Sequence, residues 1–216
     1  MAKAVLFDLD GTLLNTLGDL TAAVNHALAA HGFPTHTEAA VRTFIGDGVR
    51  QLIARACPPG TDEATQAEVL AAYLPYYAVH NKDKTVPYPG VMDLLHALKA
   101  AGYRLGVVSN KHAPGVQALC AHYFEGLLDM AVGNDDTRPP KPAPDSLLYA
   151  MGQMGLAPED VWFVGDSVMD VQTAHAAGVR SVAVTWGFQD ADRLIAEKPT
   201  AMAHEAEEVA NAVQFL

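Results

Sequence analysis

The chain has 216 residues, 50% of them apolar, and its 14 basic and 25 acidic side chains give a formal net charge of −11. This composition excludes a disordered chain, and the acidic balance argues against nucleic acid or an anionic membrane as a partner. No apolar run is long enough to span a membrane, the first residues do not form a signal-peptide pattern, and two cysteines are too few for a disulfide framework. We therefore expect a cytoplasmic protein with free thiols. The sequence sets no expectation for its oligomeric state.

The first half of the chain predicts one strand followed by helices. The strand is expected at 4–9 and breaks at Gly11, and the residues from 17 to 32 repeat apolar side chains every three or four positions, as a helix does. Further helices are expected over 38–44, 49–56 and from 62 onward. Pro75 should kink or end the last of them. No strand is predicted between about 17 and 80.

The second half predicts strands that alternate with single helices. The expected strands are 105–109, 128–132, 161–164 and 181–185. The expected helices are 91–102, 114–123, 145–154 and one that ends at Gly178. Continuously apolar strands that alternate with helices are typical of a parallel sheet covered on both faces. We predict an α/β fold with a Rossmann-like core formed by 1–14 and 86–216, and a helical domain, 15–85, inserted after the first strand.

Polar side chains follow the predicted strands, at the edge where parallel sheets bind ligands. These residues are Asp8, Asp10, Gly11, Thr12, Ser109, Asn110, Lys111, Lys141, Gly165, Asp166, Ser167 and Asp170. Carboxylates that converge raise one another's pKa and need a cation. Mg²⁺ prefers oxygen ligands and also binds phosphate oxygens. The sequence therefore predicts a Mg²⁺ site for a phosphorylated ligand.

Two of these motifs also have a purely structural interpretation. The pair Asp8 and Asp10, followed by glycine, fits a strand that ends in an Asp-Gly turn. Ser167 and Asp170 have the spacing of a helix capping box, in which Asp170 would only cap the helix. The functional interpretation makes Asp166 a metal ligand and Asp170 a ligand or a neighbour of one.

The two lysines near these strand ends are expected to differ. Lys141 lies between two prolines, which fix the backbone of its loop. A solvated lysine is the ordinary alternative, but an acidic cleft that binds phosphate needs a cation, and this favours Lys141 as a phosphate ligand. Ser109 and Asn110 supply a hydroxyl and a backbone N–H suited to phosphate oxygens. Lys111, which follows them, is expected to be exposed.

The motifs DLDGT, VVSN, Lys141-Pro142 and GDSxxD, in this order, resemble the haloacid dehalogenase superfamily of aspartate-nucleophile phosphatases. The helical insert resembles the mobile cap of that family. The stretches DLDGTLLNTLGDL and GDSVMDVQTAHAAGV are similar to phosphoglycolate phosphatase-type members, and the resemblance covers nearly the whole chain. It implies Mg²⁺-dependent hydrolysis of a small phosphorylated metabolite, such as 2-phosphoglycolate.

The resemblance also implies a role for each motif residue. Asp8 would attack phosphorus and become an aspartyl phosphate, and Asp10 would protonate the leaving oxygen and later activate water. Mg²⁺ would be held by Asp8, by the backbone carbonyl of Asp10 and by Asp166, with Asp170 nearby. Thr12 would orient the two aspartates. The transferring group would be bound by Ser109, Asn110 and Lys141.

The insert carries the residues expected to select the substrate. Gly46-Asp47-Gly48 precedes one of its helices, and a glycine-rich helix start can bind anions. Arg50 or Arg42 could reach a substrate carboxylate, although each is also explained as a surface charge.

Other functions stay open at this point. They are a pyrophosphatase or a sugar-phosphate phosphatase or mutase of the same superfamily, and a non-enzymatic receiver module phosphorylated on Asp8. Receiver modules also gather acids and a lysine at sheet ends, but they are shorter and lack a helical insert. Asn15-Thr16 replaces the Asp-Ser common at the first hinge of the family, and the sequence offers no role for Asp135 and Asp136.

Overall fold

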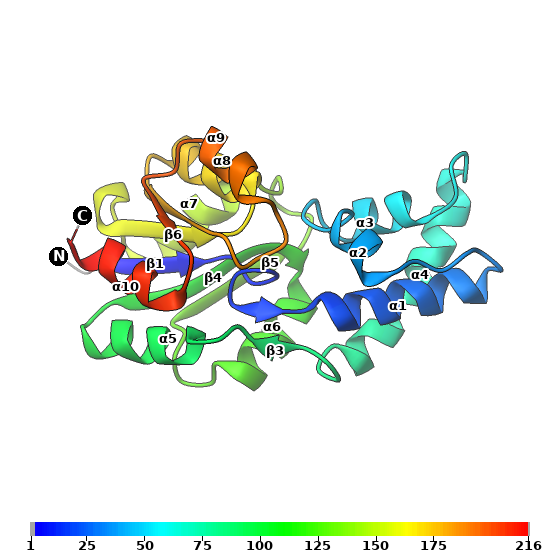
Figure 1. Ribbon diagram of the computed structural model, residues 1–216, viewed down its shortest axis with the longest axis horizontal. Coiled ribbons are helices and arrows are strands. Elements are labelled where there is room, and N and C mark those ends of the chain that lie inside the picture. The colour runs from blue at the N-terminus through cyan, green and yellow to red at the C-terminus, as the bar shows by residue number, and fades with distance from the viewer. Residues whose placement is uncertain (1–2, 216) are drawn as a thin grey trace. The chain divides into compact units, whose positions relative to one another are not determined.

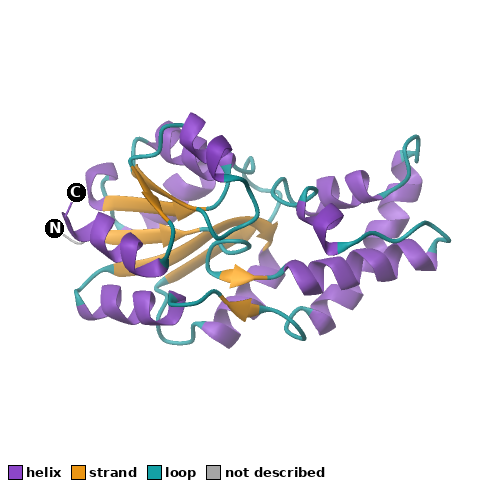
Figure 2. Cartoon of the chain, in the orientation of Figure 1, coloured by secondary structure: helices purple, strands orange, loops and turns teal. Residues whose placement is uncertain are grey.

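The structure is a computed structural model that describes residues 3–215. The chain folds into two compact units. The core unit consists of the chain up to Leu14 and from Pro87 onward, and the helical unit is Asn15–Val86 (Figures 1 and 2). The expected division after residue 85 lies one residue from this one. That the helical unit acts as a cap stays a prediction.

The core unit is built on a six-stranded sheet in which all neighbouring strands are parallel. Its order is β5 (Met130–Asn134), β4 (Arg104–His112), β1 (Ala4–Phe7), β6 (Val161–Gly165), β7 (Arg180–Val184) and β8 (Ala201–Ala203). From β1 the chain adds β4 and then β5 on one side before it crosses to β6 on the other. This is the strand order of Rossmann folds, and it confirms the predicted fold class.

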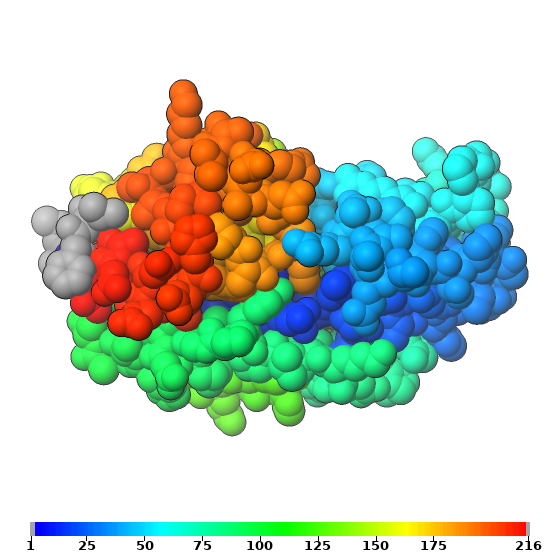
Figure 3. All heavy atoms as spheres, in the orientation of Figure 1, coloured from blue at the N-terminus to red at the C-terminus, as the bar shows by residue number. Residues whose placement is uncertain are grey.

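Helices cover both faces of this sheet because its central strands are apolar on both sides. In β1, Val5 and Phe7 pack on one face, and Ala4 and Leu6 pack on the other. The first face is covered by α5 (Val91–Ala100), α6 (Ala113–Tyr123) and α10 (Ala206–Phe215). The second face is covered by α7 (Asp145–Met154) and α8 (Val168–Ala177). Figure 3 shows the C-terminal helix α10, in red, beside the green segment that contains α5.

The helical unit has an apolar core of its own. Its helices are α1 (Leu17–Ala30), α2 (Glu38–Arg42), α3 (Val49–Ala56) and α4 (Glu63–His80). Leu20, Val24 and Ile53 are among the side chains buried between them. The side chains of Thr37 and Asp62 accept hydrogen bonds from the first turns of α2 and α4, as N-caps do. The short strands β2 (Leu14–Asn15) and β3 (Val86–Pro87) pair with each other.

The structure differs from the sequence prediction at Pro75 and at the end of the sheet. Pro75 does not end α4, which continues to His80, and Tyr73 and Tyr77 on either side of it are buried in the core of the unit. A kink at Pro75 stays a prediction. The strand series does not finish at residue 185, since β8 follows α9 (Ala191–Ala196). Three residues are too few to give a periodic pattern. Among residues 3–215, no helix is both long and apolar enough to cross a membrane.

Candidate active site

Asp8 stands directly after β1, at the centre of the sheet edge. Its backbone N–H donates a hydrogen bond of 2.8 Å to the Val164 carbonyl on β6, which keeps the residue in line with the sheet. The carboxylate is buried, and its Oδ1 lies 3.0 Å from Lys141 Nζ in an ion pair. Burial raises the pKa of Asp8 to about 6, with a further rise from Asp170 and Asp10, against the lowering effect of Lys141.

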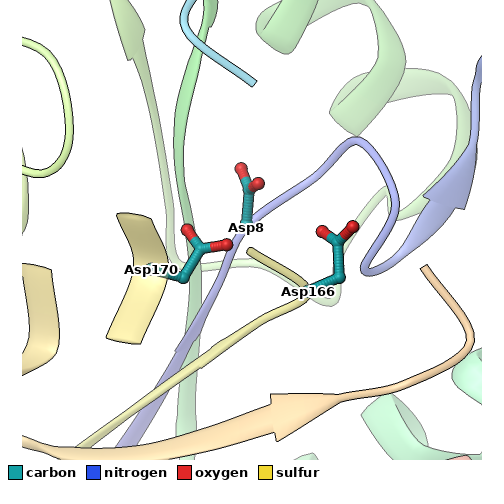
Figure 4. Close-up of side chains that lie close together, drawn as sticks. All are labelled: Asp8, Asp166 and Asp170. Carbon is teal, nitrogen blue, oxygen red and sulfur yellow. The ribbon is translucent and has the colours of Figure 1, made fainter. Parts of the chain in front are cut away.

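Three carboxylates converge at this point (Figure 4). Asp8, Asp166 and Asp170 are all buried, and one oxygen of each lies within 4.8 Å of the other two. They follow β1 and β6, the neighbouring strands between which the strand order reverses. That reversal is where open α/β sheets bind ligands. Among the described residues, no other group of three or more aspartate, glutamate, histidine or cysteine side chains is arranged to hold a metal ion. The Asp10 side chain does not belong to this cluster, and the ligand predicted at this position, the Asp10 backbone carbonyl, stays a prediction.

Asp166 is held by two donors and by two glycines. The Thr12 hydroxyl donates to Oδ1 at 3.0 Å, and the Phe188 backbone N–H donates to Oδ2 at 2.7 Å. A Cβ atom on Gly11 or Gly187 would overlap the Asp166 side chain, so both positions require glycine. Burial, followed by the charges of Asp170 and Asp8, raises the pKa of Asp166 to about 8.

Asp170 caps α8 and also belongs to the cluster. Its Oδ2 accepts hydrogen bonds from the Ser167 backbone N–H at 3.0 Å and from the Ser167 hydroxyl at 2.6 Å, which completes a capping box. Its Oδ1 accepts from Lys141 Nζ at 2.6 Å. A Cβ on Gly165 would overlap this side chain. The capping and functional interpretations of Asp170 are therefore compatible, since one oxygen serves each.

Lys141 is a buried cation among these acids. Its Nζ contacts Asp8 and Asp170 and lies 3.2 Å from the Val108 carbonyl. Burial alone would lower the pKa of Lys141, but Asp170 and Asp8 raise it above its usual value. Its backbone forms a reciprocal pair with the Asn110 side chain, in which Lys141 N donates to Oδ1 at 2.7 Å and Nδ2 donates to the Lys141 carbonyl at 3.0 Å. Asn110 thus anchors the loop that carries Lys141.

Asp10 and Lys111 form a second ion pair, which corrects the expectation that Lys111 is exposed. Lys111 Nζ lies 3.0 Å from both carboxylate oxygens of Asp10. The side chains of Lys111 and Asp10 are only 6% and 13% exposed. β4 loses its register with β5 between Val108 and His112, and such an irregularity redirects side chains in a way that no spacing rule foresees.

The remaining predicted residues fall into two groups. Thr12 and Ser109 are buried in the core unit with the acids. Gly46, Asp47, Gly48 and Arg50 belong to the helical unit, at the loop before α3 and in its first turn. Asp47 forms an ion pair with Arg55 of the same unit, and Arg42 and Arg50 are exposed. The role of these helical-unit residues in substrate selection stays a prediction.

The acids at 135 and 136 shape a turn before the Lys141 loop. Asp135 accepts hydrogen bonds from the Thr137 backbone and hydroxyl and pairs with Arg138 at 2.9 Å. These hydrogen bonds, with the Arg138 charge, lower the pKa of Asp135. Asp136 has a φ of 61°, a left-handed conformation that aspartate tolerates in turns.

The loop after β7 contributes to the site but was not among the residues predicted from the sequence. Trp186 Nε1 donates to the Thr12 carbonyl at 3.0 Å, Gly187 makes room for Asp166, and Phe188 donates to it. A signal was present, because Gly187 follows a predicted strand at the same sheet edge as the other candidates.

The donor set fits a divalent cation. Three buried carboxylates supply hard oxygen ligands, which Mg²⁺ and similar ions prefer. The raised pKa values of Asp8 and Asp166 mean that their charged forms are costly without additional positive charge. Lys141 provides one such charge, and a bound cation would provide the rest. The residues that would hold it are Asp8, Asp166 and Asp170.

Comparisons of sequence and of structure with known proteins agree on one family. Residues 5–184 match the model of the haloacid dehalogenase-like hydrolases. Phosphoglycolate phosphatase 1 of Pseudomonas aeruginosa is 38% identical over 210 residues, which cover 93% of this chain and 75% of that protein. Phosphoglycolate phosphatase of Escherichia coli is 36% identical over 222 residues, covering 91% and 86%. The crystal structure of a predicted phosphoglycolate phosphatase from Haemophilus somnus has a TM-score of 0.92 at 32% identity, covering 99% and 98%.

Proposed function

Because the chain belongs to the haloacid dehalogenase-like hydrolase family and is a phosphoric monoester hydrolase, we propose that it hydrolyses 2-phosphoglycolate with Mg²⁺ through an aspartyl phosphate. The names of its relatives support this substrate. The observation that carries the mechanism is the convergence of Asp8, Asp166 and Asp170 at one sheet edge, with Lys141 paired to Asp8 and Asp170.

In the first half of the reaction, an Asp8 oxygen attacks phosphorus. The bond from this oxygen to phosphorus forms as the bond from phosphorus to the ester oxygen breaks. The ester oxygen takes the electron pair and accepts a proton from the Asp10 carboxyl, so that an alcohol leaves. Asp8 suits this role because it lies at the end of the central strand, where its backbone is hydrogen bonded to β6 and its direction is fixed.

In the second half, water attacks phosphorus and gives its proton to Asp10. The bond between Asp8 and phosphorus breaks, inorganic phosphate leaves, and the Asp8 carboxylate is restored. Asp10 then carries the proton that the next substrate needs. The same carboxyl group thus acts first as an acid and then as a base.

Charge neutralisation allows a dianionic ester to approach three buried acids. Mg²⁺ held by Asp8, Asp166 and Asp170 would supply positive charge against the phosphoryl group. Lys141 contributes a fixed positive charge beside Asp8 and Asp170. Thr12 and Phe188 hold Asp166 in place. Ser109, which is buried within β4, is proposed to donate a hydrogen bond to the transferring group.

The test is a phosphate-release assay with Mg²⁺ and with EDTA over a panel of 2-phosphoglycolate, pyrophosphate and hexose phosphates. The highest kcat/KM is expected for 2-phosphoglycolate, with no turnover in EDTA. Asp8→Asn should fold and lose at least ~10³-fold in kcat, the order seen when a nucleophilic residue is removed. Retention of most activity by Asp8→Asn would refute the mechanism. A higher kcat/KM for pyrophosphate or a hexose phosphate would refute the substrate, and isomerised product by NMR would indicate a mutase.

The helical unit is proposed to select the substrate as a cap. Gly46, Asp47, Gly48 and Arg50 lie in the loop and first turn of α3, and the exposed Arg50 carries a charge that suits a substrate carboxylate. Arg50→Met should raise KM for 2-phosphoglycolate more than for an ester without a carboxylate. A cytoplasmic location remains a prediction of the sequence.

A further inference from the structure

The mechanism above leaves one buried lysine without a role. Lys111 Nζ lies 3.0 Å from both oxygens of Asp10, and neither side chain is more than 13% exposed. We propose that Lys111 is a positioning residue that directs the Asp10 carboxyl group toward the leaving-group oxygen. This inference rests on the proposed function, in which Asp10 transfers the proton.

The backbone around Lys111 is fixed before its side chain begins. β4 departs from its register with β5 between Val108 and His112, and α6 starts directly afterwards at Ala113. A Cβ on Gly133 of β5 would collide with the Lys111 carbonyl and with Ala113. β5 therefore packs directly against this backbone, and the bend holds Lys111 at one place on the sheet edge.

The aliphatic part of Lys111 is also confined. A Cβ on Gly115, in the first turn of α6, would lie 3.4 Å from Lys111 Cε. The Lys111 side chain thus runs past the helix start at van der Waals distance from this position. An ammonium group at equal distance from both oxygens fixes the direction in which the Asp10 carboxylate points, whereas a single hydrogen bond would let it rotate.

Another lysine–aspartate pair in the chain makes the same contact with both carboxylate oxygens but is exposed to solvent. Lys99 Nζ lies 3.2 Å from both oxygens of Asp129, in the same core unit. There the lysine and aspartate side chains are 36% and 28% exposed. Exposed pairs restrict their partners little because water screens them. Lys99→Met is therefore the control for the removal of a lysine that faces an aspartate.

The test compares two leaving groups. An alkyl phosphate such as 2-phosphoglycolate needs a proton on its leaving oxygen, whereas p-nitrophenolate leaves readily without one. We expect Lys111→Met to lower kcat/KM for the alkyl ester, which reports the steps up to formation of the aspartyl phosphate, by about 10²-fold, the order of general acid catalysis, with little change in kcat/KM for p-nitrophenyl phosphate. Hydrolysis of the aspartyl phosphate is common to both substrates and also uses Asp10, so a fall in kcat for both is expected when that step limits turnover. Lys111→Arg, which keeps the charge, should recover part of the loss. Lys99→Met should change the kinetic constants for neither substrate.

A double variant shows whether Lys111 acts through Asp10. Asp10→Asn and Asp10→Asn/Lys111→Met should have the same kcat for the alkyl ester, because the lysine has nothing left to direct. Equal losses of kcat/KM on both substrates, or losses that multiply in the double variant, would overturn the inference and indicate a phosphate ligand instead. A kcat/KM for p-nitrophenyl phosphate equal to that of the wild type, together with an unchanged melting temperature, shows that the variant is folded. If Lys111→Met does not fold, Lys111→Gln and Lys111→Arg serve for the same comparison.

The two proposals fail in different ways. The proposed function would be refuted if the wild type is inactive with Mg²⁺ or if Asp8→Asn is active. An active wild type, an inactive Asp8→Asn and a Lys111→Met variant that does not distinguish the leaving groups would overturn only the role of Lys111.

Discussion

Replacing Asp166 by asparagine is expected to stabilise the metal-free protein while it removes metal binding. Asp166 is buried within 4.8 Å of carboxylate oxygens of Asp8 and Asp170. Two like charges at this distance repel by about 3 kcal/mol at an effective dielectric constant of 20. Asparagine keeps the size of the side chain, and its carbonyl can still accept from Phe188, but the negative charge is gone.

The stabilisation should depend on pH. The pKa of Asp166 in the folded protein is about 8, against 3.8 for the ordinary side chain, so the folded state binds this proton more tightly than the unfolded state. The stability that the proton contributes is complete below pH 3.8 and is lost as the pH rises through 8. Asp166→Asn has no such loss. Its advantage should therefore be absent in acid and largest above pH 8.

The assay is thermal unfolding in EDTA over this pH range, with and without Mg²⁺. A gain of about 3 kcal/mol corresponds to a rise of roughly 6 to 12 °C in a protein of this size. Mg²⁺ should stabilise the wild type, by about 2.7 kcal/mol at a hundred times Kd, and should stabilise Asp166→Asn little. Asp93→Asn, which changes an exposed acid on α5, is the control. An Asp166→Asn protein that melts below the wild type in alkaline EDTA, or gains as much from Mg²⁺, would refute the reasoning.

Three further predictions concern groups away from the metal ligands. Asp19→Ala should destabilise the helical unit by at least about 2 kcal/mol in urea unfolding, because Asp19 accepts from Lys84 N, Thr85 N and the Thr85 hydroxyl; Asp19→Asn should lose less. Asn110→Ala should lower kcat by about 10²-fold, since the loop that carries Lys141 loses its anchor, and should also lower the melting temperature, because the backbone N–H and carbonyl of Lys141 lose their buried partners; an unchanged kcat would contradict this. Burial raises the pKa of Cys120 to about 12, so this thiol should resist a thiol reagent near pH 8 in the folded protein and react in urea.

The sequence was sufficient to predict the site residues that come directly after strands. Asp8 and Asp166 come directly after apolar runs, and parallel strands bring such positions to one edge. The order of the strands could not come from the pattern alone, but the alternation of strands and helices left few possibilities. Asp170 was foreseen in two roles because its spacing from Ser167 suits both, and the structure uses one oxygen for each.

The parts that the sequence did not predict depend on contacts between distant segments. Lys111 was expected in solvent, because nothing in its neighbourhood indicates the loss of register in β4 that directs it to Asp10. Asn110 anchors a loop 31 residues away. Gly187 makes room for Asp166, and only the packed structure shows that its missing Cβ matters. β8 is too short for a pattern.

The central claim is that Asp8 carries the phosphoryl group during turnover. Borohydride reduces an aspartyl phosphate to homoserine, so enzyme mixed with Mg²⁺ and 2-phosphoglycolate, quenched in acid and reduced, can be analysed by peptide mass spectrometry. Homoserine is expected at position 8 and at no other aspartate, and it should be absent when substrate is left out. Active enzyme that yields unmodified Asp8, or homoserine at another position, would contradict the account.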